Sequence, residues 1–139
     1  MDNIRLTYEV EGGDLTQAGE ASAQVKQTLR KLGFDPDTIR RVSVCMYEGE
    51  INMVIHADGG TATVDIGLSD ITITLADQGP GIPDIDQAMQ AGYTTAGEVA
   101  RDLGFGAGMG LPNMKKYTDQ MAIETVIGAG TTMTLTVQV

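Results

Sequence analysis

The chain is organised around the stretch Gly104-Phe-Gly-Ala-Gly-Met-Gly-Leu-Pro-Asn-Met114, in which four glycines alternate with other residues and stop where a helical pattern begins. Glycine permits positive φ angles and a close approach of the backbone to a ligand, and the first N–H groups of a helix are unpaired donors at the positive end of its dipole. This combination suits a polyphosphate. The stretch lacks the Gly-Lys-Ser/Thr of a P-loop, and a dinucleotide fingerprint would need a glycine where Met109 stands. Taken alone, a glycine-rich turn is more often an ordinary loop than a phosphate site.

The composition narrows the classes of protein to consider. A chain of 139 residues, 42% of them apolar, predicts one domain with a real core. Its net charge of −10 disfavours nucleic acid and anionic membranes as partners, because the few basic residues are scattered. A single cysteine, Cys45, and the lack of a signal segment at the N-terminus favour the cytoplasm. With one histidine, a structural zinc site is excluded, and no apolar run approaches the roughly 20 residues that span a bilayer.

The periodicity of apolar residues predicts an α+β fold. We expect one helix capped by Asp14 or Thr16 and ending at Gly33, and a second that starts at Asp35-Pro36 and runs to about Ala57. A third helix is expected to begin at Leu111, directly after the glycine stretch. Alternation of apolar and polar residues predicts strands. The predicted strands cover residues 3–10, 62–68, 71–77, 121–127 and 131–139. This order gives a mainly antiparallel sheet with helices on one face.

The second helix carries an unusual set of polar residues. Glu48, Asn52 and His56 are spaced four residues apart and share one face of the helix. Such a stripe is more often simply exposed to solvent, but apolar neighbours on both sides of it indicate that the helix is mostly buried. Glutamate and asparagine there need partners or a cavity. Glu50 falls on a different face, and we interpret it as a solvated carboxylate.

A second candidate position lies at the end of the strand 71–77. Period two places Asp77 on the same inward face as Ile73 and Leu75, so its carboxylate needs hydrogen-bond donors. The following turn, Gln78-Gly-Pro-Gly81, would let a flat ligand approach the backbone. Periodicity then fades between Ile82 and Leu103, which predicts a lid or a binding loop.

Together these segments carry a family resemblance. Glu48-x-x-x-Asn52-x-x-x-His56, Asp77-x-Gly79-x-Gly81 and Gly104-x-Gly-x-Gly-x-Gly-Leu111, in that order, resemble the three boxes of the GHKL ATPase superfamily. Within it, the chain resembles the bacterial anti-sigma factor and switch-protein serine/threonine kinases, and its Gly-Leu-Pro-x-x-Lys-Lys ending is closer to the switch-kinase branch. The resemblance implies a two-layer α/β sandwich, the Bergerat ATP-binding fold, as one domain over residues 1–139 with an ATP lid at 82–107.

The resemblance also implies a role for each box. Glu48 would be the catalytic base, Asn52 would coordinate Mg²⁺, and Asp77 would accept the adenine amino group. The implied ATP-binding residues are Asn52, His56, Asp77, Gly79, Gly81, Ile82, Gly104, Gly106, Gly108, Met109, Gly110 and Leu111.

The sequence departs from the family pattern in two respects. The family usually has alanine after the glutamate, where this chain has Gly49 at a cost to the helix of about 1 kcal/mol. The sigma-binding kinases tend to have an arginine near the last glycines, where this chain has Phe105 and Ala107, although Arg101 is a candidate replacement.

Two classes of function therefore stay open. The first is a kinase that uses ATP and Mg²⁺ to phosphorylate a serine or threonine of a small STAS-type antagonist. The second is a non-catalytic, ATP-gated module that sequesters a sigma factor or another regulator. Both involve a protein partner and allow for a homodimer, and the acidic surface does not choose between them.

Overall fold

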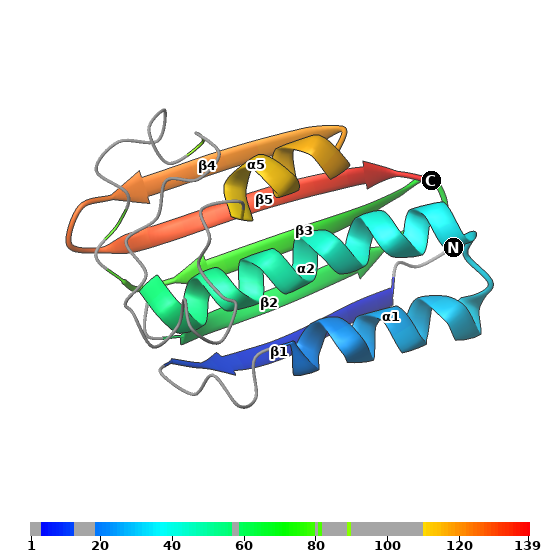
Figure 1. Ribbon diagram of the computed structural model, residues 1–139, viewed down its shortest axis with the longest axis horizontal. Helices are drawn as coiled ribbons and strands as arrows, with labels where there is room; N and C mark the ends of the chain where they lie inside the picture. Colours follow the sequence, from blue (N-terminus) through cyan, green and yellow to red (C-terminus); the bar gives the residue numbers. More distant parts are fainter. Residues whose placement is uncertain (1–3, 13–18, 57–58, 80, 82–88, 90–109) are drawn as a thin grey trace.

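The computed structural model describes residues 4–12, 19–56, 59–79, 81, 89 and 110–139 (Figure 1). Its strands form a five-stranded antiparallel sheet in the order β1-β2-β3-β5-β4, and the helices cover one face of it. This confirms the predicted α+β architecture. In chain order the elements are β1 (Ile4–Glu11), α1 (Glu20–Leu32), α2 (Pro36–His56), β2 (Gly59–Ile66), β3 (Asp70–Asp77), α5 (Gly110–Tyr117), β4 (Gln120–Val126) and β5 (Gly130–Gln138). No helix in these ranges is long and apolar enough to cross a membrane.

Strict alternation along the strands gives the sheet two different faces. The face under the helices is a core of fully buried apolar side chains, including Val64, Ile73 and Leu135 in one cross-strand row. The opposite face carries a row of threonines. Thr7, Thr63, Thr74 and Thr134 are cross-strand neighbours. Threonine is β-branched and polar, so it suits a sheet face that none of the described helices covers.

The strand register places the two ends of the described chain at the same end of the sheet. Ile4 pairs with Ile66, which pairs with Ile71, which in turn pairs with Val137 near the end of β5. Asp77 lies at the other end of the sheet. The C-terminal half of α2 packs over that end, because Met53 lies beside Gly60 close to the backbone of Asp77. The candidate site is therefore at the end of the sheet away from the chain ends.

The helix α1 begins later than predicted and is capped from another helix. Neither Asp14 nor Thr16 lies in the described residues, and the N-cap is Gly19, which has no side chain to offer. The carboxylate of Glu50 supplies the missing acceptors: its oxygens accept hydrogen bonds from the N–H groups of Ala21, at 3.2 Å, and Ser22, at 3.1 Å. Glu50 is only 3% exposed, so its interpretation as a solvated carboxylate was wrong. The positive end of the α1 dipole compensates its charge.

The bounds of α2 follow the prediction, and its glycine has a structural reason. The carboxylate of Asp35 accepts a hydrogen bond from the N–H of Thr38 at 2.9 Å, which lowers the pKa of Asp35. Further along, a Cβ at Gly49 would overlap with Cδ1 of Leu75 on β3. The missing methyl group thus lets α2 lie close to the sheet.

We predict that Glu50→Ala lowers the free energy of unfolding by about 2–4 kcal/mol, because it leaves buried N–H groups at the start of α1 without acceptors. Urea unfolding at neutral pH measures the loss. Glu20→Ala is the matched control, since Glu20 is an exposed glutamate in the first turn of the same helix. Equal effects of the two substitutions would contradict the capping role.

Candidate functional site

Glu48 lies on the outer side of α2, where α5 packs against it. Its carboxylate is half-buried, and one oxygen accepts a hydrogen bond of 3.4 Å from the side-chain amide of Asn113 on α5. Burial raises the pKa of Glu48 above its ordinary value, and the hydrogen bond from Asn113 opposes that shift. A half-buried carboxylate with a raised pKa and no basic partner among the described residues is suited to taking up a proton.

Asn52 follows one helical turn later and is also half-buried. His56 is the last residue of α2, and its side chain lies outside the described residues. The backbone therefore places Glu48, Asn52 and His56 on one helix face, as predicted from their spacing.

Asp77 ends β3 with its side chain on the same sheet face as Ile73 and Leu75, as the alternation predicts. It is half-buried. Its Oδ1 accepts hydrogen bonds from the N–H groups of Gly79, at 2.9 Å, and Thr131, at 3.2 Å. No described residue bonds to Oδ2. One oxygen thus holds the turn to β5.

The turn after Asp77 requires glycine for reasons of its own. Gly81 has a φ of 83°, in the left-handed region, and a Cβ there would lie 2.8 Å from the carbonyl oxygen of Val126 and 3.1 Å from Cα of Ile127. The turn therefore packs against the tip of the β4–β5 hairpin. This packing and the positive φ angle explain why residue 81 is glycine, whether or not a ligand binds beside the turn.

The glycine stretch is described only at its end. Gly110 begins α5 and Leu111 is buried. Ile82, Gly104, Gly106, Gly108 and Met109 lie outside the described residues, as does the predicted lid at 82–107 apart from Met89, which packs against the core.

The residue that fixes α5 was missed from the sequence. Arg41, which we interpreted as one of the scattered solvated cations, is half-buried and donates from Nε to the carbonyl oxygen of Tyr117 at 3.1 Å. It also pairs with Asp119 at 2.7 Å, and Asp119 in turn accepts a hydrogen bond from the N–H of Gln138 at 2.7 Å. The helix α2 therefore holds α5 near both ends, through Asn113 and through Tyr117.

These residues fit a nucleotide better than a metal held by protein alone. Within the described residues, no group of three or more His, Cys, Asp or Glu side chains could hold a metal ion. Mg²⁺ in ATP sites usually has few protein ligands, because phosphates and waters supply the rest. A carboxylate oxygen of Asp77, the amide of Asn52 and the start of α5 at Gly110 are donors and acceptors of the kinds that adenine, Mg²⁺ and phosphate require.

Comparison with known proteins identifies the class. The model of the histidine kinase-like ATPase domain family matches residues 13–137. The chain belongs to this family, so it is an ATP-binding domain of the kind that the three boxes predicted.

Relatives within the family narrow the comparison. The chain is 32% identical over 110 residues to the serine/threonine-protein kinase RsbT of Bacillus subtilis (strain 168). The alignment covers 76% of this chain and 77% of the relative. It is 34% identical over 110 residues to the anti-sigma F factor of Caldanaerobacter subterraneus subsp. tengcongensis, which covers 74% and 73%. Both names match the predicted resemblance to anti-sigma factor and switch-protein kinases.

A solved structure matches the fold. It holds the RsbU and RsbW domains of a Mycobacterium tuberculosis protein, and it superposes with a TM-score of 0.62 at 19% identity, covering 96% of this chain and 32% of the other. The chain thus spans about a third of that solved chain.

We predict that Asn113→Ala raises the pKa of Glu48 further, because the substitution removes a hydrogen bond that favours the ionised carboxylate. Titration of the Glu48 carboxyl carbon by NMR measures the change. Lys115→Ala is the control, since Lys115 is exposed on the same helix. An unchanged or lower pKa in Asn113→Ala would show that the two side chains are not coupled.

Proposed function

We propose that the chain is a serine/threonine protein kinase that transfers the γ-phosphate of ATP to a hydroxyl group of a small regulatory protein. The observation that carries the proposal is the state of Glu48. It is a half-buried carboxylate with a raised pKa, and it lies where α2 meets the helix that follows the glycine stretch. The kinship with a relative named serine/threonine-protein kinase supports the same reading.

In this proposal Glu48 acts on the acceptor. The hydroxyl oxygen of the acceptor attacks the γ-phosphorus, the bond from that phosphorus to the β-γ bridging oxygen breaks, and the hydroxyl proton moves to Glu48. A pKa raised toward the working pH makes the carboxylate a stronger base while it is still ionised. The rate should therefore rise with pH through the pKa of Glu48 in the folded protein.

Other residues of the chain would hold the nucleotide. Asp77 would accept the adenine amino group at Oδ2 while Oδ1 keeps its backbone donors. Asn52 would hold Mg²⁺, whose chemistry is to neutralise phosphate charge. Gly110 and the other glycines of its stretch would offer backbone N–H groups to the phosphates.

The partner would be a protein. Relatives named anti-sigma F factor support a sigma factor or its STAS-type antagonist as the partner. The same names favour a second candidate function, an ATP-gated module that sequesters its partner without phosphorylating it. The two functions differ in one measurable step, the transfer of labelled γ-phosphate.

We predict that Asp77→Asn lowers ATP affinity by about 1–3 kcal/mol, because an N–H donor then faces the adenine amino group. The new side chain keeps an oxygen for Gly79 and Thr131, so the turn should survive. Calorimetry measures the affinity, and circular dichroism checks the fold. Unchanged affinity in a folded variant would exclude Asp77 as the adenine acceptor.

We predict that Glu48→Gln lowers the phosphotransfer rate by about 10²- to 10⁴-fold with nearly unchanged ATP affinity, because it removes the base and keeps the size. Asn52→Ala is the matched variant one turn away, and it should weaken Mg²⁺-ATP binding itself. The assay follows labelled γ-phosphate onto a purified STAS-domain antagonist. Equal rates in wild type and Glu48→Gln, or no transfer in either, would favour the sequestering module.

A further inference from the structure

A groove of about 870 Å³ runs along the outer side of α2 beside α1. Its α2 residues recur every three or four positions, which is the spacing of one helix face. They are Pro36, Ile39, Arg40, Ser43, Val44, Tyr47 and Glu48. Because α2 also buries its opposite side against the sheet, it has an inner and an outer packing face. An outer stripe at this spacing can receive another helix.

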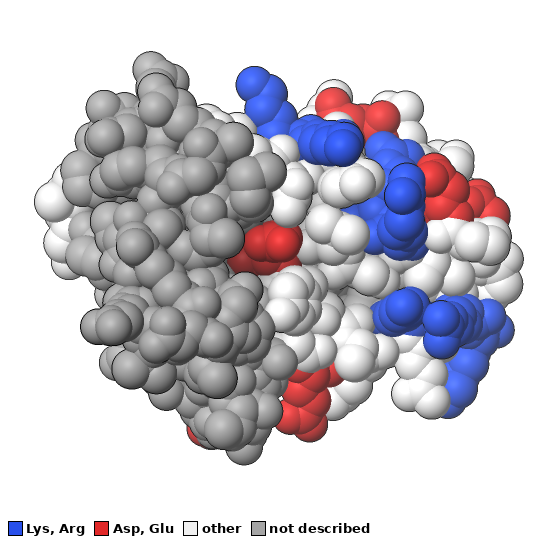
Figure 2. All heavy atoms as spheres, viewed as in Figure 1, with Lys and Arg blue, Asp and Glu red and all other residues white. Residues whose placement is uncertain are grey.

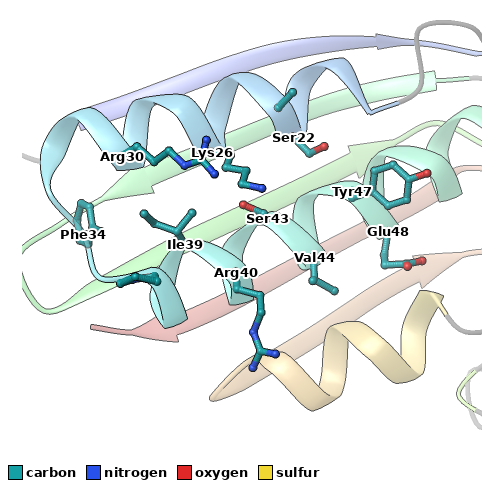
Figure 3. A pocket seen from close by; sticks show the side chains of 12 residues that line it. Ser22, Lys26, Arg30, Phe34, Ile39, Arg40, Ser43, Val44, Tyr47 and Glu48 are labelled. Atoms are coloured by element: carbon teal, nitrogen blue, oxygen red, sulfur yellow. The ribbon is translucent and has the colours of Figure 1, made fainter.

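The groove is basic in a strongly acidic chain. Lys26, Arg30 and Arg40 line it, and among the described residues that line it Glu48 is the only acidic one. Figure 3 shows Lys26 and Arg30 reaching from α1 over the gap toward α2, whereas Arg40 points to the side of α5. Within the described part of the chain, neither Lys26 nor Arg30 has an ion-pair partner. Figure 2 shows lysine and arginine side chains on the described part of the helix-covered face, with acidic side chains beside them.

A second pocket, on the other side of α1, is acidic where the groove is basic. The pocket between β1 and α1 has a volume of about 350 Å³ and is lined by acidic residues, including Glu9, Glu11 and Glu20. The two sides of α1 therefore carry opposite charge. An acidic partner would be repelled by one side and attracted to the other.

The groove lining combines apolar side chains with the hydroxyl groups of Ser22, Ser43 and Tyr47. Phe34, Ile39 and Val44 supply apolar surface. The buried Oγ of Ser43 has no hydrogen-bond partner among the described residues. Apolar residues with basic ones beside them match a helix that has an apolar stripe and acidic flanks.

We propose that this groove binds an acidic amphipathic helix of the protein substrate and brings the substrate's acceptor residue to Glu48. The inference rests on the proposed kinase function. Pro36 and Glu48 bound the α2 side of the groove and are about 18 Å apart along the helix, which is the length of three turns. Arg30 lies near the end with Phe34 and Ile39, and the candidate base lies at the other end (Figure 3).

Binding can be tested without catalysis. The probe is a fluorescein-labelled synthetic peptide of about 14 residues, with leucines on one helical stripe and glutamates elsewhere. Fluorescence anisotropy at low salt should show that Arg30→Glu weakens its binding about tenfold, because one attraction becomes a repulsion. Lys31→Glu is the matched control. It makes the same charge change in the same helical turn, but Lys31 does not line the groove.

Three outcomes would overturn the inference. One is an equal effect of Arg30→Glu and Lys31→Glu on peptide binding. Another is equal binding of a peptide whose leucines are replaced by serine, since that would reflect charge alone. The third is Arg30-dependent binding to vesicles that contain about one-third phosphatidylserine, without binding of the peptide, which would assign the groove to a lipid surface.

The same variants separate this inference from the kinase proposal. Glu48→Gln removes an acidic side chain from the groove lining, so it should bind the acidic peptide at least as tightly as wild type does. Loss of binding in Arg30→Glu together with an absence of phosphotransfer in wild type would leave the groove as a docking site and reject the kinase. Active phosphotransfer with equal peptide binding in both charge variants would reject the groove and keep the kinase.

Discussion

The packing of the helix layer depends on the buried carboxylate of Glu50. It satisfies the first N–H groups of α1 from the middle of α2, and thereby sets how the two helices lie against each other. Glu48 and Glu50 are two residues apart, so their side chains point about 200° apart around the helix axis. One carboxylate is fixed inside the protein, and the other is consequently turned outward toward α5. The orientation of the candidate base follows from the structural glutamate behind it.

A second constraint acts on α5. Arg41 bonds to the last carbonyl group of α5 and to Asp119, and Asn113 bonds to Glu48 near its start. These contacts attach α5, the helix that follows the glycine stretch, to α2. The helix α2 therefore carries the first box and holds the helix that follows the glycine stretch. Gly49 brings α2 close to β3, which carries the second box.

The sequence was sufficient for the features that depend on local periodicity. The antiparallel order, the bounds of α2 and the inward side of Asp77 all follow from alternation, caps and spacing. Glu50, Arg41 and the start of α1 could not be predicted in this way, because their roles depend on which flank of α2 another helix covers. The sequence spacing of a polar residue on a helix is the same whether its side chain contacts water or the end of another helix. Gly19 offers no side-chain cap, and this was the one local indication that an acceptor had to come from elsewhere.

The placement of the chain ends affects how this fold can be joined to other proteins. Ile4 and Val137 lie in the same cross-strand row, at the end of the sheet away from Asp77. A fluorescent protein or an affinity handle joined ahead of Ile4 or after Val137 would thus extend from the end of the sheet opposite Asp77. The same geometry suits tandem arrangements in one polypeptide, as in the solved Mycobacterium tuberculosis chain, where this fold accounts for about a third of the length. Fusion, which often obstructs a site in a small domain, should leave this one open.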